Sequence, residues 1–287
     1  MITVMRHELN MQDRSFSTYL FGFFLLETVG LAAMVYNINN KMANFEYCLS
    51  TISLIFVLII PIITMKSIAE ERKLRTDQLL YSLPLSMWDI VIGKFLATLV
   101  NFMLPMVFVA IYPVLFKRYG NVYLLTSYGS LIAFIFLGAA LIAMGMFVSS
   151  LMENQGIAAG ISAVIIALNY YSMDLANYTS STKQGSLIVV ILFSLIAGVI
   201  VRQLTKSTPA GIVAAVLLAG AAGIVYAVKS DLFEGLIPKV MSRLSLFNRF
   251  YAFVNGNFDV TAIVYYVSVT AFFLFLCVQS LEKRRYN

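Results

Sequence analysis

Long apolar runs recur along this chain at the length of a membrane-spanning helix. Several reach the roughly 20 residues that a helix needs to cross a hydrocarbon core about 30 Å thick. Lipid offers the backbone no hydrogen-bonding partner, so such runs cross it as helices. Only 12% of the residues are charged and 60% are hydrophobic, which lies outside the range of soluble domains. We therefore expect an all-α integral membrane protein, a polytopic helical bundle formed by one domain over residues 1–287.

The apolar runs predict about eight transmembrane helices. Their approximate ranges are 16–36, 47–65, 90–116, 127–150, 156–174, 186–201, 209–228 and 261–281. The run at 186–201 is short, so it and 209–228 are either two spans or one re-entrant hairpin, which would leave six full spans. Three prolines lie inside expected spans, and each should kink its helix: Pro61, Pro105 and Pro113.

The distribution of basic residues favours an N-terminus inside the cell. With both termini inside, the inner segments hold twelve Lys and Arg residues and the outer segments hold eight, four of them in the long 229–260 segment. Long segments carry less weight in the positive-inside rule. Because the basic residues flank apolar runs, the net charge of +6 does not indicate nucleic acid as a partner. The partner that this pattern predicts is the lipid bilayer.

Two further segments are amphipathic and too polar to span. The N-terminal segment places apolar residues at helical spacing opposite charged ones, namely Ile2, Met5, Leu9 and Phe16 against Arg6, Glu8 and Asp13. We expect it to lie along the inner membrane surface. Residues 229–260 carry two apolar stripes, which predict outer interfacial or re-entrant helices before the last span. Those helices either hold the fold together at the membrane surface or take part in gating.

The densest charge lies between the second and third expected spans, in AEERKLRTDQLLYSLPLSMWDIVIGK (69–94). Glu71 and Arg75 are spaced as a helical ion pair, but an exposed pair stabilises a helix by only about 0.2–0.5 kcal/mol. Stability therefore does not explain the cluster. Three apolar residues follow it, at Leu79, Pro84 and Trp88. A charged rim around apolar and aromatic anchors is typical of protein interfaces, so the stretch predicts a surface that binds a soluble partner.

This stretch resembles the first cytoplasmic loop of ABC-2 type permeases, the membrane subunits of ATP-binding-cassette exporters. The family pattern AEE(K/R)xxxTxxLLxSxPxSxxxIxxGK is matched by Ala69, Glu70, Glu71, Arg72, Thr76, Leu79, Leu80, Ser82, Pro84, Ser86, Ile90, Gly93 and Lys94. Weaker matches follow in order: Arg6, Glu8 and Leu9; SSLMENQ with Glu153, Asn154 and Gln155; and LFNRFYAFVNGNFDVTAIVYYVSV. The last is most similar to the branch of gliding-motility-associated and copper-site-assembly permeases.

The resemblance implies a permease that couples ATP hydrolysis by a separate subunit to export across a bacterial inner membrane. Family members bind that ATPase through this loop, the coupling helix, so the residues expected to carry coupling are Glu70, Glu71, Arg72, Arg75, Leu79, Pro84 and Trp88. The partners implied are two ATPase copies, which bind ATP and magnesium, and a second permease, identical or a sister. The family normally has six spans, so the additional pair near 186–228 leaves the substrate unassigned.

Two enzymatic interpretations fail on the residues present. A phosphate loop needs glycine at the position of Trp88 and Ser or Thr at that of Phe95, so this chain has no ATP site of its own. Glu70, Glu71 and Arg75 also match the E-E-x-x-x-R motif of CAAX-type intramembrane proteases. That enzyme class needs histidines on later helices, whereas the single histidine here precedes every expected span.

Glu27 is the only ionisable residue expected deep inside a span. A carboxylate at the bilayer centre costs about 2.5–3.5 kcal/mol, so it should face protein or a water-filled cavity. It is either a hydrogen-bonded carboxyl packed against another helix or a residue that lines a pathway. The second possibility supports an alternative function, an ATP-independent channel or secondary carrier with Glu27 as its proton or cation site. A purely structural membrane anchor is a third possibility.

Overall fold

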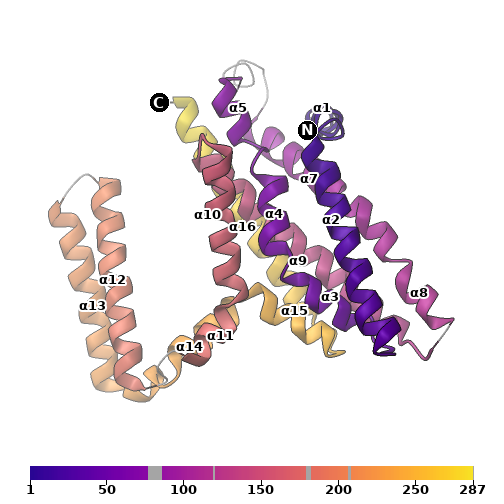
Figure 1. Cartoon of the computed structure of the whole chain (residues 1–287). Helices are drawn as coiled ribbons and strands as arrows, with labels where there is room; N and C mark the ends of the chain where they lie inside the picture. Colours follow the sequence, from indigo (N-terminus) through magenta and orange to yellow (C-terminus); the bar gives the residue numbers. More distant parts are fainter. Residues whose placement is uncertain (77–85, 119, 179–181, 206–207, 287) are drawn as a thin grey trace. The chain divides into compact units, whose positions relative to one another are not determined.

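The structure, a computed structural model, describes residues 1–76, 86–118, 120–178, 182–205 and 208–286 (Figure 1). Over these residues the regular structure is helical, which confirms the predicted all-α class. The chain divides into two compact units, one formed by Met1–Tyr170 with Arg249–Asn287 and the other by Tyr171–Asn248. The single permease domain expected over the whole chain stays a prediction, because a compact unit need not be a separate domain.

The first unit contains the N-terminal amphipathic helix, the charged stretch and most of the long apolar helices. Its helices are α1 (Ile2–Gln12), α2 (Phe16–Ala33) with its π-helical continuation η1 (Met34–Asn39), α3 (Glu46–Ser53), α4 (Phe56–Thr64), α5 (Ala69–Leu74), α7 (Met87–Val109), α8 (Tyr112–Lys117), α9 (Leu124–Leu151), α10 (Gln155–Tyr170) and α16 (Val260–Tyr286). In Figure 1, α1, α5 and the C-terminal end of α16 lie at the same end of this unit. Which side of a membrane this end faces stays a prediction.

Four helices in the described part of the chain are long and apolar enough to cross a membrane. They are Phe16–Asn39, Met87–Lys117, Leu124–Leu151 and Val260–Arg285. A fifth span exists if Glu46–Ser53 and Phe56–Leu74 form one span bent by 63°. The apolar helices Gln155–Tyr170, Lys183–Leu195 and Ala215–Val228 are shorter. The multi-pass character is therefore confirmed, whereas eight spans stay a prediction.

The bend in the second span does not lie at Pro61, where we expected it. Pro61 lies inside α4, and the break separates α3 from α4 at Leu54 and Ile55. Ile55 N donates to Ile52 O at 2.8 Å and Val57 N to Leu54 O at 3.1 Å, so this turn is tightened to three-residue spacing. A proline ring clashes with the carbonyl four residues earlier, here that of Val57. The Val57 carbonyl, which the Pro61 ring would crowd, therefore lies two residues after Ile55.

The two other prolines in expected spans differ from each other. Pro105 lies inside α7, as predicted. Pro113 lies in the first turn of α8, because α7 has already ended at Val109. A proline there loses no hydrogen bond, since the first turn of a helix has no intrahelical acceptor for its N–H groups. The helix of the span Met87–Lys117 is therefore interrupted at Ala110 and Ile111, just before Pro113, and whether the span bends there stays a prediction.

The core of the first unit is built around α9. Within its most apolar stretch 78% of the residues are buried, against 22–33% for the other three spans. It packs against α16, α10, α4 and α7. Gly138 makes the contact with α7 possible, because a Cβ at this position would lie 2.4 Å from Cζ of Phe102. The small residues of this apolar run thus bring neighbouring helices close.

We expect Gly138→Ala to lower the free energy of unfolding by about 1–3 kcal/mol, the usual cost of overpacking a core. The added methyl group would overlap the ring of Phe102, which is fully buried and cannot swing into solvent. Unfolding of the purified protein in detergent measures the effect. Gly160→Ala on α10 is the matched control, since nothing lies within 4 Å of its added Cβ. Equal losses in the two variants would contradict this packing.

The segment before the last span forms α15 (Leu246–Val254), whose larger part belongs to the first unit. Phe250 and Phe253 are 0% and 2% exposed, and Ser130 Oγ on α9 donates to Phe253 O at 3.0 Å. Cζ of Arg249 lies 4.0 Å from the ring centre of Tyr265 on α16, a cation–π contact. The predicted amphipathic helix is therefore present, and it is packed against two spans.

The second unit contains the additional helix pair. Its elements are α11 (Ser172–Tyr178), α12 (Lys183–Thr205), α13 (Thr208–Val228), the 3-10 helix η2 (Ser230–Phe233) and α14 (Leu236–Leu244). Helices α12 and α13 lie side by side, and Lys183 at the start of α12 forms an ion pair with Asp231 in η2. Helix α14 packs on α11. The predicted hairpin is thus present, whether it spans the membrane or re-enters it.

Candidate functional site

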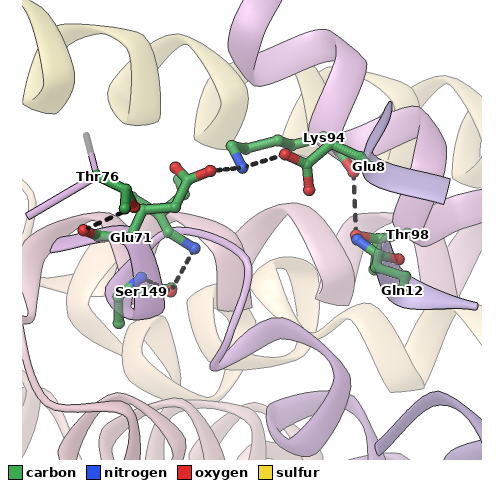
Figure 2. Close-up of polar contacts among 9 residues, drawn as sticks. Glu8, Gln12, Glu71, Thr76, Lys94, Thr98 and Ser149 are labelled. Atoms are coloured by element: carbon green, nitrogen blue, oxygen red, sulfur yellow. Dashed lines mark hydrogen bonds and ion pairs between the residues drawn. The ribbon is translucent and has the colours of Figure 1, made fainter. Parts of the chain in front are cut away.

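A buried group of three charged side chains joins α1, α5 and α7 (Figure 2). Lys94 on α7 is 1% exposed, and its Nζ donates to Glu8 Oε1 on α1 at 2.6 Å and to Glu71 Oε1 on α5 at 2.7 Å. Figure 2 shows the ammonium between the two carboxyl groups. We call these three residues the Lys94 triad. It connects the N-terminal helix and the charged stretch to one membrane span.

The Lys94 triad has the geometry of a strong interaction. A buried ion costs several kcal/mol of desolvation, which only close opposite charges and short hydrogen bonds offset. Distances of 2.6 and 2.7 Å lie in the short range of charge-assisted bonds. The side chain of Glu71 is 17% exposed, against 6% for Glu8, so the triad reaches solvent on the α5 side. Removing Lys94 would take from both carboxylates the ammonium that they bind.

Gly93 lets α1 lie close enough to α7 for this contact. A Cβ at Gly93 would lie 2.9 Å from Cγ1 and 3.0 Å from Cβ of Val4, a buried residue of α1. Contacts so short essentially never occur between real side chains, so only glycine fits here. Two adjacent residues therefore hold α1, Gly93 by its lack of a side chain and Lys94 by its charge.

Further polar contacts continue along the same two helix faces. Gln12 Nε2 on α1 donates to Thr98 Oγ1 on α7 at 3.3 Å. Asn101 Nδ2 donates to Gln12 Oε1 at 2.7 Å. Thr98 and Asn101 lie four and seven residues after Lys94, and Gln12 lies four after Glu8, so each set shares one helix face. Helix α1 is thus fixed to α7 along its length.

The start of α5 is fixed by a third helix. Ser149 Oγ on α9 accepts the N–H groups of Ile68 and Ala69 at 3.3 and 3.0 Å and donates to Met65 O at 3.1 Å. The first N–H groups of a helix lack intrahelical partners, so this hydroxyl supplies part of what α5 needs. Helix α5 is therefore attached to α9 at its first residues and to α7 through Glu71.

The end of α5 comes earlier than the charge pattern predicted. The helix ends at Leu74, and Arg75 has a φ of 56°, in the left-handed region. Thr76 N then donates to Glu71 O at 2.9 Å, which closes the helix end. The helical spacing predicted for Glu71 and Arg75 is therefore wrong. Glu71 turns to Lys94, and Arg75 points to solvent.

The structure divides the seven predicted coupling residues into three groups. Glu71 is in the Lys94 triad, and Arg72 is 6% exposed, so these two lie inside the protein. Glu70 is partly exposed, and Arg75 is exposed. Trp88 is 43% exposed at the start of α7, with its ring 6.3 Å from that of Phe275 on α16. The other two, Leu79 and Pro84, lie outside the described residues.

Glu8 and Lys94 are the site residues whose roles the sequence did not reveal. We placed Glu8 on the solvent side of an amphipathic helix, opposite Ile2 and Phe16. The structure corrects this for Glu8, which is 4% exposed, whereas Ile2 and Phe16 lie on the outer surface of the chain at 69% and 77% exposed. Pairing with Lys94 decides the orientation of α1, because a buried ammonium needs opposite charge. The sequence feature that could have indicated this pairing is Lys94, a lysine near the start of the apolar run 90–116.

The structure places two further carboxyl groups in apolar helices. Glu27 is exposed on α2, near the middle of the span Phe16–Asn39. Glu46, the first residue of α3, is 2% exposed and accepts a hydrogen bond from Ser127 Oγ at 3.3 Å. Glu46 precedes the apolar run 47–65, and the hydropathy pattern did not indicate that it would be buried. The two residues lie on different helices.

Residues 3–186 match the family model described as "ABC-2 family transporter protein". The matched region begins in α1, contains the Lys94 triad and all of α5, and ends near the start of α12. It covers more than half of the chain. No curated protein and no solved structure matched.

Proposed function

Because the chain belongs to the ABC-2 family of transporter proteins, we propose that it is the permease subunit of an exporter driven by a separate cytoplasmic ATPase. The observation that carries this proposal is the Lys94 triad, which ties the short charged helix α5 to a membrane span through buried ion pairs. A rigid link between a cytoplasmic element and a span is what a motor-driven permease requires. We propose a bacterial inner membrane as its location, with both termini cytoplasmic.

The first step of the proposed mechanism is docking of the ATPase on α5. Glu70, Lys73 and Arg75 offer charge of both signs at the surface of this helix and its end. Trp88 provides an exposed aromatic group at the start of α7. Exposed charges guide association and fix the orientation of a partner, while a large aromatic anchor supplies contact area. Glu71 and Arg72 stay inside and hold the surface in place.

The second step is the transfer of motion to the membrane helices. When the ATPase pair closes on ATP, it displaces α5. Glu71 then pulls on Lys94, and Ser149 moves with the first residues of α5, so α7 and α9 both follow. Helix α1 moves with α7, because Glu8 and Gln12 hold it there. Packed helices move as rigid bodies and deform little, so a displacement of α5 can be passed on to the membrane helices.

The proposed assembly contains two ATPase subunits and a second permease, either another copy of this chain or a sister. ATP and magnesium bind to the ATPase subunits, in keeping with the missing phosphate loop. In this assembly ATP binds and is hydrolysed outside the membrane, and this chain provides the path for the substrate.

Reversing the two exposed charges, with Glu70→Lys and Arg75→Glu together, should reduce recovery of the ATPase with the purified permease by about tenfold or more. Two contacts would turn repulsive, and like charges at an interface cost several kcal/mol. Affinity purification from membranes measures it, with permease level as reference. Lys117→Glu with Arg118→Glu is the matched control, because these exposed charges lie at the other end of the same span. Unchanged recovery in the first variant would argue against docking at α5.

An ATP-independent carrier is the second candidate. The exposed mid-span position of Glu27 favours it, and the buried Glu46 adds a second carboxyl group. Within the described residues, however, no contact joins the two. Substrate movement through the reconstituted chain without any ATPase would select this function over the first.

A further inference from the structure

The last turn of α9 and the loop after it, SSLMEN (149–154), connect α5 to a helix that the proposed mechanism does not yet include. We call these residues the SSLMEN segment. The fully buried hydroxyl of Ser149 accepts the N–H groups of Ile68 and Ala69 and donates to Met65 O. A hydroxyl has one proton and two lone pairs, so these three bonds use its whole capacity. Helix α5 therefore cannot shift relative to this end of α9 without breaking them.

The next residue of the SSLMEN segment is bonded to the last span, α16. Ser280 Oγ on α16 donates to Ser150 O at 3.1 Å. Helix α9 ends at Leu151, so Ser150 O is one of the last carbonyl groups of the helix, which have no partner within it. The Ser280 hydroxyl supplies that partner. Two adjacent residues of α9 are thus bonded to different helices, Ser149 to α5 and Ser150 to α16.

Two further contacts follow the same face of α16. The fully buried Cys277 is in hydrogen-bonding contact with the side chain of Ser150. Arg284 Nη2 lies 3.2 Å from Glu153 Oε1 in the loop after α9. Cys277, Ser280 and Arg284 are three and four residues apart, so they share one face of the helix. The Glu153 pair lies at the surface of this unit, where ion pairs contribute little, so the contacts of Ser150 hold the junction.

We propose that the SSLMEN segment passes the displacement of α5 on to α16, with Ser150 and Ser280 as the positioning residues of this second junction. The inference rests on the proposed function, since the ATPase docked on α5 supplies the displacement. It adds the last span to α1, α7 and α9, which the Lys94 triad and Ser149 already connect to α5. Ser149 and Ser150 are neighbours in one continuous helix, so α5, the end of α9 and α16 move as one body.

Ser280→Ala tests the junction, because it leaves Ser150 O without its donor. We expect ATP hydrolysis by the reconstituted assembly to fall by about three- to tenfold, the factor by which one hydrogen bond shifts an equilibrium. Ser280→Thr keeps a hydroxyl and should retain most of the activity. Ser268→Ala is the matched control on the same helix, since that hydroxyl donates to Val264 O of α16 itself. Equal hydrolysis in Ser280→Ala and wild type would overturn the proposal.

A double variant separates transmission from a merely structural role. If motion passes through Ser149 and then through Ser280, a break at the first leaves little for the second to lose. Residues that act as a unit give such non-additive losses. Hydrolysis with Ser149→Ala and Ser280→Ala together should therefore be close to that of the more impaired single variant. Losses that multiply would show that the two serines act independently, and would overturn the serial path.

Recovery of the ATPase with the permease is measured on the same samples, so the two levels of the account fail differently. A wild-type assembly that contains no ATPase would reject the proposed function and this inference with it. An assembly whose bound ATPase is stimulated equally by wild type and Ser280→Ala would reject only the role of the SSLMEN segment.

Discussion

Lys94→Ala should have the largest effect of any single substitution in this chain. The free energy of unfolding should fall by about 3–5 kcal/mol, because Glu8 and Glu71 would both lose the buried ammonium that they bind. Stimulation of the ATPase by the permease should fall with it, since α5 would lose its bond to α7. Unfolding in detergent measures the first effect, and ATP hydrolysis by the reconstituted assembly measures the second.

A second variant separates stability from coupling. In Glu8→Leu, Lys94→Met and Glu71→Leu combined, apolar side chains replace the whole triad, and such replacements are often neutral or stabilising. We expect this protein to fold near wild-type stability but to stimulate the ATPase less, because α5 is no longer bonded to α7. The single substitution Lys94→Arg keeps the positive charge, so we expect this variant to retain part of the coupling. Full coupling in the apolar variant would show that the triad serves stability alone.

Gly93→Leu should release α1 from α7. The leucine side chain would occupy the space of Val4, and overpacking alone typically costs about 1–3 kcal/mol. Displacing α1 also separates Glu8 from Lys94, so the loss should lie at or above the top of that range. Limited trypsin digestion provides the readout, because Arg6 and Arg14 are exposed at α1 and just beyond it, and a released helix is cut faster.

The matched control for this prediction is Gly22→Leu on α2, where nothing lies within 4 Å of an added Cβ. It introduces the same side chain into a helix of the same unit at a position where an added Cβ meets open space. We expect its digestion to follow the wild type. If Gly93→Leu also left the digestion rate and the unfolding free energy unchanged, the close approach of α1 and α7 would be refuted.

Local patterns in the sequence predicted local structure well. The apolar runs at 16–36 and 127–150 correspond to α2 and α9, because hydrophobic length is a property of a single segment. Ser86 and Asp89 have the spacing of a helix N-cap, and in the structure Ser86 Oγ accepts the N–H of Asp89 at 3.1 Å. The charged stretch also matches the family to which the chain belongs.

Contacts between distant segments could not be predicted in this way. Glu8 and Lys94 are separated by 86 residues, and helical periodicity says nothing about which helix will pack against which. On its own, the pattern of α1 placed Glu8 in solvent, and only the buried lysine reverses that. Likewise, helical spacing does not show that Glu71 bonds Lys94 on α7 or that Ser149 on α9 holds the first residues of α5. The division of the coupling residues into inner and outer groups follows from these long-range contacts.

The span count shows a different limit. Residues 47–65 form one apolar run, yet α3 and α4 meet at a bend of 63°. Hydropathy measures how apolar a segment is and not whether its backbone continues straight. The run at 209–228 forms most of α13. Its hydropathy does not specify whether lipid or other protein covers that helix. Whether that helix spans the membrane therefore cannot be predicted from its composition.

The central claim is that this permease works through an ATPase docked on α5 and linked to the spans by the Lys94 triad. It is tested most directly by ATP hydrolysis of the assembly purified from native membranes, compared between wild type and the Glu70→Lys, Arg75→Glu variant at equal permease content. The account predicts hydrolysis that copurifies with the wild type and is lost with the variant. A wild-type permease that transports without any nucleotide-hydrolysing subunit would contradict it.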